Sequence, residues 1–164
     1  MKNTVLWAYA AALGMTAGVV PGIALANPPA AQAQSRAAVE SVLRAVEAAL
    51  ARGDTAEKVT KMLYAEDIVI TEDEPGSIRG LAAATQGVQG FIDSYGPGGG
   101  KGCKFTLVDP AVASSTTFTS YLSLSCKANP PVLKDNMDLR LLYSWKKLPQ
   151  GWRVVLETVQ AGKF

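Results

Sequence analysis

The sequence contains no histidine and only two cysteines among its 164 residues. Without histidine, a Ser-His-Asp triad, a Cys-His pair and a histidine-ligated zinc site are all excluded. Two cysteines alone make a poor metal site. We therefore expect no bound metal and no cofactor.

An excess of charge of either sign is also lacking, because 16 Lys and Arg stand against 14 Asp and Glu. Proteins that bind nucleic acid present a basic surface, and the two signs are interspersed here without a basic run. We therefore expect no nucleic-acid partner and, once the N-terminal segment described next is removed, no membrane partner.

A long apolar run occurs only at the start of the chain. Lys2 is followed by an uncharged stretch, by the helix breaker Pro21-Gly22 and by Ala24-Leu25-Ala26. A positive start, an apolar middle and a small-residue site are typical of a secretory signal. Cleavage is expected after Ala26, with Ala31-Gln32-Ala33 as a second possible site. The alternative is an uncleaved membrane anchor, because the run approaches spanning length.

This segment sets the expected domain organisation and compartment. We predict a signal peptide over residues 1–26, a disordered linker over 27–34 and one folded domain over 35–164. The protein is then expected to be periplasmic or secreted.

Helical periodicity dominates the first part of the domain. Apolar residues recur at helical spacing at Val39, Leu43, Val46 and Leu50, which predicts a helix from Ser35. Gly53 suits the position just after its end. Asp54 and Glu57 have the spacing of a capping box, which predicts a second helix to about Tyr64. Strands are then predicted at Asp67–Thr71 and Ser77–Arg79, followed by a helix at Leu81–Tyr95.

The two cysteines lie on two predicted strands, Cys103–Asp109 and Thr116–Lys127. Placing Cys103 opposite Cys126 also sets Phe105 opposite Leu124, so one register matches apolar with apolar residues. Directly opposed strand residues are within disulfide reach. We predict a Cys103–Cys126 disulfide, and two buried free thiols are the alternative.

The C-terminal segment Asp138–Phe164 predicts a hairpin about a Pro149-Gln150-Gly151 turn. With Lys147 opposite Trp152, Trp145 lies opposite Val154, Tyr143 opposite Leu156 and Leu141 opposite Thr158. One face is then apolar and aromatic, and the other, which carries Glu157, combines charged, polar and apolar residues. A mixed face can pack against a second subunit, which predicts a homodimer through the sheet.

Three segments resemble proteins of the nuclear transport factor 2-like superfamily, which includes ketosteroid isomerase and the SnoaL-type cyclases. They are ALARGD at Ala49–Asp54, LYAEDIVITEDEPG at Leu63–Gly76 and YSWKKLPQGWRVV at Tyr143–Val155. The resemblance implies an α+β fold in which a cone-shaped, curved antiparallel sheet packs against three N-terminal helices.

The resemblance also implies candidate catalytic residues. The general base of ketosteroid isomerase falls on Asp73 and its oxyanion-hole carboxylic acid on Asp138. The oxyanion-hole tyrosine falls near Val46, where this chain has no tyrosine. The alternative interpretation of Asp73 is an exposed acidic turn.

Aromatic side chains are the candidate lining of a cavity in the cone, or else ordinary core. They are Tyr64, Tyr95, Tyr121, Tyr143, Trp145 and Trp152. Three functions stay open: binding of a small apolar ligand or a partner in or around the cone; acid/base catalysis on a hydrophobic substrate, of isomerase, cyclase or dehydratase type, with Asp73 as base; and dimerisation alone.

Overall fold

The computed structural model describes residues 29–72, 76–95, 99–128, 130 and 134–164. Within them lie three α-helices, one short 3-10 helix and six strands. The helices are α1 (Pro29–Arg52), α2 (Ala56–Leu63) and α3 (Leu81–Tyr95), and the 3-10 helix is η1 (Gly99–Gly102). The strands are β1 (Tyr64–Thr71), β2 (Ser77–Arg79), β3 (Cys103–Ala113), β4 (Thr117–Cys126), β5 (Met137–Leu148) and β6 (Gly151–Ala161).

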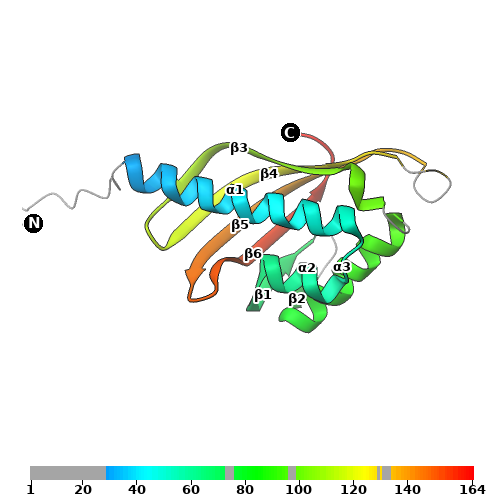
Figure 1. Cartoon of the computed structure of the whole chain (residues 1–164), viewed down its shortest axis with the longest axis horizontal. Helices are drawn as coiled ribbons and strands as arrows, with labels where there is room; N and C mark the ends of the chain where they lie inside the picture. The colour runs from blue at the N-terminus through cyan, green and yellow to red at the C-terminus, as the bar shows by residue number, and fades with distance from the viewer. Residues whose placement is uncertain (1–28, 73–75, 96–98, 129, 131–133) are drawn as a thin grey trace, which may run out of the picture.

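The strands form one curved sheet with the order β2-β1-β6-β5-β4-β3. Helix α1 crosses one face of this sheet, and α2 and α3 lie near one end of it (Figure 1). The α+β architecture predicted from the sequence is confirmed. The sheet is not wholly antiparallel, however, because β1 pairs with β6 in parallel. These two strands are distant in sequence, so no hairpin constrains their relative direction.

Helix α1 begins at Pro29 rather than at Ser35, so residues 29–34 of the predicted linker are helical. Proline is well tolerated in the first turn of a helix, and alanines follow it. Ser35 is buried within the helix and donates a hydrogen bond to the carbonyl of Ser114. The predicted apolar stripe from Val39 to Leu50 is buried.

Two charged side chains of α1 bind the backbone of the edge strand β3. The Phe105 N–H donates to the Glu47 carboxylate, and the Arg44 guanidinium donates to the Phe105 carbonyl. Arg44 and Glu47 also form an ion pair. The groups of Phe105 that an edge strand leaves unpaired are therefore satisfied by the helix.

The junction between α1 and α2 differs from the prediction by one residue. Gly53 has a φ of 76°, as expected after a helix end. The cap of α2 is Thr55, whose side chain accepts from the Lys58 N–H, and not Asp54. The Asp54 carboxylate instead pairs with Arg52 and Lys58.

Strands β3 and β4 have the predicted register. Cys103 pairs with Cys126, Phe105 with Leu124 and Leu107 with Leu122. The Cys103–Cys126 disulfide is present and both cysteines are buried, so the prediction is confirmed. Strand β3 continues past the predicted end at Asp109 to Ala113, with an irregular register between Val108 and Val112.

The β5–β6 hairpin follows the predicted register only near its turn. Lys147 pairs with Trp152 and Trp145 with Val154, as predicted. A β-bulge then leaves Val155 without a partner, so Ser144 pairs with Leu156 and Tyr143 with Glu157. The predicted Tyr143–Leu156 and Leu141–Thr158 pairs are therefore wrong. One extra residue turns every later side chain to the opposite face, which brings Glu157 and Val159 to the concave side.

Over the described residues, no helix has the length and apolar character that a membrane span requires. The predicted signal segment, residues 1–26, lies outside the described residues.

Candidate functional site

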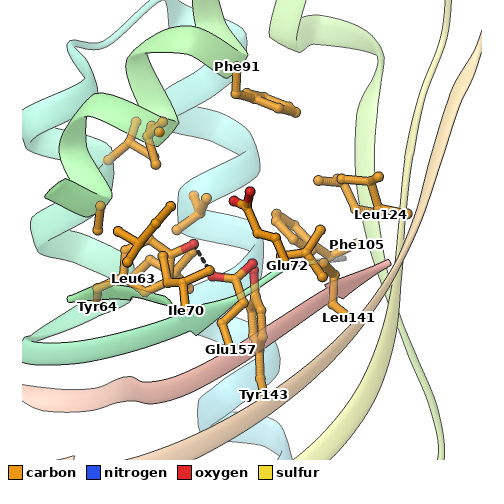
Figure 2. Close-up of a pocket in the computed structure, with 18 of the residues that line it drawn as sticks. Leu63, Tyr64, Ile70, Glu72, Phe91, Phe105, Leu124, Leu141, Tyr143 and Glu157 are labelled. Atoms are coloured by element: carbon orange, nitrogen blue, oxygen red, sulfur yellow. Dashed lines mark hydrogen bonds between the residues drawn. The ribbon is translucent and has the colours of Figure 1, made fainter. Parts of the chain in front are cut away.

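A cavity of about 170 Å³ lies between the helices and the concave face of the sheet. All three α-helices and all six strands of the described part of the chain contribute to its walls, which are mostly apolar. Figure 2 shows Phe91, Phe105, Leu124 and Leu141 around it. The polar groups that reach it from the described residues are the side chains of Tyr64, Glu72, Tyr143 and Glu157.

Glu157 is the buried charge-bearing group of this cavity, with only 5% of its surface exposed. The Tyr64 hydroxyl donates a hydrogen bond to its Oε2 atom (Figure 2). Burial raises the pKa of Glu157 from 4.5 to about 7, against the opposing effect of the Tyr64 and Tyr143 hydroxyls. Near neutral pH this carboxyl therefore exists in both protonation states.

The two tyrosines beside Glu157 stay protonated. Burial, followed by the nearby Glu157 carboxylate, raises the pKa of both Tyr64 and Tyr143 well above the usual value. Their hydroxyls are thus hydrogen-bond donors across the physiological range. Together with Glu157 they form a polar cluster at the floor of an apolar cavity, called the carboxyl–phenol cluster below.

Glu72 lines the same cavity but is exposed, so it lies at the mouth. It directly follows β1, whose Ile70 pairs with Glu157. Figure 2 shows the Glu72 carboxylate pointing toward the space between Phe91 and Glu157. Its negative charge also raises the pKa of Glu157.

Comparison with solved structures gives the fold. A nuclear transport factor 2-like protein of unknown function from Shewanella oneidensis matches with a TM-score of 0.61 and 16% identity over 76% of this chain and 97% of that one. A nuclear transport factor 2-like superfamily protein from Salmonella enterica matches with a TM-score of 0.59 and 11% identity over 80% and 94%. A ketosteroid isomerase-like protein from Erwinia carotovora matches with a TM-score of 0.57 and 14% identity over 78% and 96%.

The chain has the nuclear transport factor 2-like fold. No protein-family model matches it, and no curated protein matches it. Assignment to the SnoaL-type subclass stays a prediction, because likeness at these identities shows the fold alone.

Within the nuclear transport factor 2-like cone, two of the six predicted cavity aromatics reach the cavity, Tyr64 and Tyr143. Trp145 and Trp152 are buried core instead, and the Trp145 indole N–H donates to the Ser120 hydroxyl. Tyr121 is 44% exposed on the outer face, where its ring meets Phe164 edge-on. The side chain of Tyr95 lies outside what the structure describes.

Of the two predicted catalytic carboxyls, Asp73 lies outside the described residues. Asp138 does not line the cavity. Its carboxylate accepts a hydrogen bond from Ser125 and pairs with Lys163, 3.4 Å away. The Ser125 hydroxyl, followed by Lys163, lowers the pKa of Asp138, so this group is ionised and unsuited to donate a proton.

The carboxyls that do reach the cavity, Glu157 and Glu72, were not among the predicted site residues. Strict alternation along β6 places Glu157 on the outer face, and only the bulge at Val155 brings it inside. Glu72 adjoins Asp73 in the acidic segment that the resemblance had marked. No three metal-ligating side chains are grouped anywhere in the described ranges.

Proposed function

We propose that this domain binds a small, largely apolar molecule in its cavity, with the carboxyl–phenol cluster engaging the polar end of that molecule. The observation that carries the proposal is a buried, titratable Glu157 that faces an apolar space of about 170 Å³. A buried polar group is costly unless it is paired, and ligand cavities combine apolar walls with a few such groups.

Blocking the mouth tests this proposal. Gly87 lines the cavity from α3 and is exposed, so it lies at the mouth, and a Cβ added there meets no other atom within 4 Å. Gly87→Leu is expected to weaken ligand binding by about tenfold, because the new side chain occupies the entrance. The measurement is native mass spectrometry of protein purified from its own cell envelope, followed by calorimetry with any molecule found.

The matched control is Gly90→Leu in the same helix. Gly90 also has free space around an added Cβ but does not line the cavity. Both substitutions favour the helix to a similar extent, so a difference in binding reports the cavity alone. Equal affinities of the two variants would contradict binding at this site.

The alternative function is acid/base catalysis on a hydrophobic substrate. A carboxyl with a pKa of about 7 accepts and donates protons near neutral pH, which makes Glu157 rather than Asp138 the group favoured by the described residues. The same experiment separates the two functions. A catalytic domain converts the recovered molecule on incubation, whereas a binding domain returns it unchanged.

We also propose that the protein is exported and dimerises through the outer face of its sheet. The disulfide supports export, because such bonds persist in oxidising compartments.

Exposed Val112, Tyr121 and Leu156 support dimerisation through an apolar contact on the outer face of the sheet. Sedimentation is expected to give a dimer, and a Tyr121→Lys, Leu156→Lys double variant is expected to be monomeric. A monomeric wild-type protein would contradict dimerisation.

A further inference from the structure

The charges in the cavity are of one sign. Its lining in the described part of the chain includes Glu72 and Glu157 and no Lys or Arg. Both carboxyls belong to the β1–β6 region, because Glu72 directly follows β1 and Glu157 lies on β6. An anionic ligand would place a third negative charge in a partly desolvated space, whereas a cation would relieve the repulsion between these two.

The walls also suit a cation. Four aromatic residues line the cavity, namely Tyr64, Phe91, Phe105 and Tyr143. The face of an aromatic ring attracts an ammonium group, and this attraction grows when water is excluded. The helices supply apolar side chains to the lining. The ammonium group of a ligand would therefore contact the carboxyl groups on the sheet side, and the hydrocarbon part of the ligand would contact apolar side chains on the helix side.

We infer that the ligand is an apolar amine, bound with its ammonium group between Glu72 and Glu157 and its hydrocarbon part among the aromatic and aliphatic walls. This inference rests on the proposed binding function. The size of the ligand follows from the cavity, because a space of about 150 Å³ holds benzene. A single ring with a short aminoalkyl chain is therefore a suitable probe.

Three probes of nearly equal shape separate the effect of ligand charge on affinity from the effect of ligand shape. They are 2-phenylethylamine, which is a cation at neutral pH, 2-phenylethanol, which is neutral, and phenylacetate, which is an anion. Calorimetry at about pH 8 is expected to show the amine binding about tenfold more tightly than the alcohol, and the acid not binding measurably.

Charge-neutral variants then test which carboxyl groups cause the preference for the amine. Glu157→Gln and Glu72→Gln keep the shape of each side chain and are each expected to bring the amine close to the alcohol in affinity. Glu66→Gln is the matched control, because Glu66 is exposed on β1 and does not line the cavity. It is expected to leave the preference for the amine unchanged.

The pH dependence is a second readout. The titratable groups that face Glu157 are Tyr64 and Glu72 from the β1 side and Tyr143 from β5, and the remaining elements present apolar lining. An ammonium group favours the ionised carboxyl, so amine affinity is expected to rise about tenfold between about pH 6 and about pH 8 in the wild type. It is expected to stay nearly level in Glu157→Gln.

The outcomes are distinguishable. If none of the three probes binds, the proposed function fails together with this inference. If the alcohol or the acid binds as tightly as the amine, the cavity is a binding site and the inference about its charge is overturned. If the amine is preferred but Glu66→Gln abolishes the preference as strongly as the cavity variants do, the ammonium group lies elsewhere and the inference is also overturned.

Discussion

Glu157→Gln is expected to raise the free energy of unfolding at about pH 8 by roughly 3 kcal/mol, and to change it much less at about pH 5. The wild-type carboxyl is buried, and ionising it in the folded protein is unfavourable. Glutamine keeps the size and an acceptor oxygen for the tyrosine hydroxyls but does not titrate. The gain in stability therefore grows as pH rises through the interval between the unfolded-state and folded-state pKa values of the wild-type residue, and it is complete above the upper value.

The direction in which stability changes with pH follows from the pKa of Glu157 in the unfolded and in the folded protein. Its pKa is 4.5 in the unfolded chain and about 7 in the folded protein. Between these values the folded protein binds more protons, so wild-type stability is greatest below the lower value, falls as pH rises and levels off above the upper one. Asp54, Glu57 and Asp138 have lowered pKa values, so their stabilising effect is lost only in more acidic solution.

Urea unfolding across a pH series measures this effect. The wild type is expected to lose stability from about pH 5 to about pH 8, and Glu157→Gln is expected to show a much flatter profile. Glu66→Gln is the control, because Glu66 is exposed. A wild-type profile that is flat over this range, or one that Glu157→Gln leaves unaltered, would show that Glu157 is not buried as described.

Removing the disulfide is expected to lower the free energy of unfolding by about 3 kcal/mol. Cys103 and Cys126 are 23 residues apart in sequence, so the bond closes a loop of moderate length in the unfolded chain. It also fastens the end of the edge strand β3 to β4, beside the cavity residues Phe105 and Leu124. The measurement is urea unfolding of a Cys103→Ala, Cys126→Ala double variant.

Reductant supplies the control for the disulfide. The wild type under reducing conditions is expected to approach the double variant, and the variant is expected to be insensitive to reductant. Because both cysteines are buried, access of the reductant is expected to require unfolding. A wild type whose unfolding midpoint is the same with and without complete reduction would contradict a stabilising role.

The β3–β4 pair was predictable from sequence because two independent patterns agree on it. The alternation of apolar residues and the positions of the cysteines both select the register that sets Phe105 opposite Leu124. A one-residue slip would break both patterns at once. The apolar stripe of α1 was likewise predictable, since its spacing repeats over several turns.

The polar floor of the cavity was not predictable in the same way. A β-bulge has no strong sequence signature when the extra residue is an ordinary one, and Val155 is as suited to a regular strand as to a bulge. The position of the bulge depends on how β6 fits between β1 and β5, and both of these pairings shift register. Information of that kind lies in the assembled sheet and not in any local pattern.

The start of α1 and the cap of α2 were not predicted correctly, because each segment contains a second residue that suits a helix boundary. Thr55 directly follows Asp54, which also suits an N-cap, and Ser35, another residue that suits an N-cap, lies within the first turns of the helix that begins at Pro29. Propensity alone does not rank such neighbours, because their capping energies are similar. The Ser35 hydroxyl, which does not cap α1, instead donates to the Ser114 carbonyl, far away in sequence.

The bulge in β6 makes the chemistry of the cavity a matter of position in the chain as much as of residue type. Leu156 and Glu157 are adjacent, and the bulge between the turn and this point decides which of them faces the cavity. If β6 paired regularly, without the bulge, Leu156 would lie opposite Tyr143 and Glu157 would face outward, so a hydrocarbon would replace a carboxyl in the cavity without a change in either side chain. Two chains of this fold with nearly identical last strands can therefore differ in the polarity of their cavities, depending on whether the last strand contains the bulge.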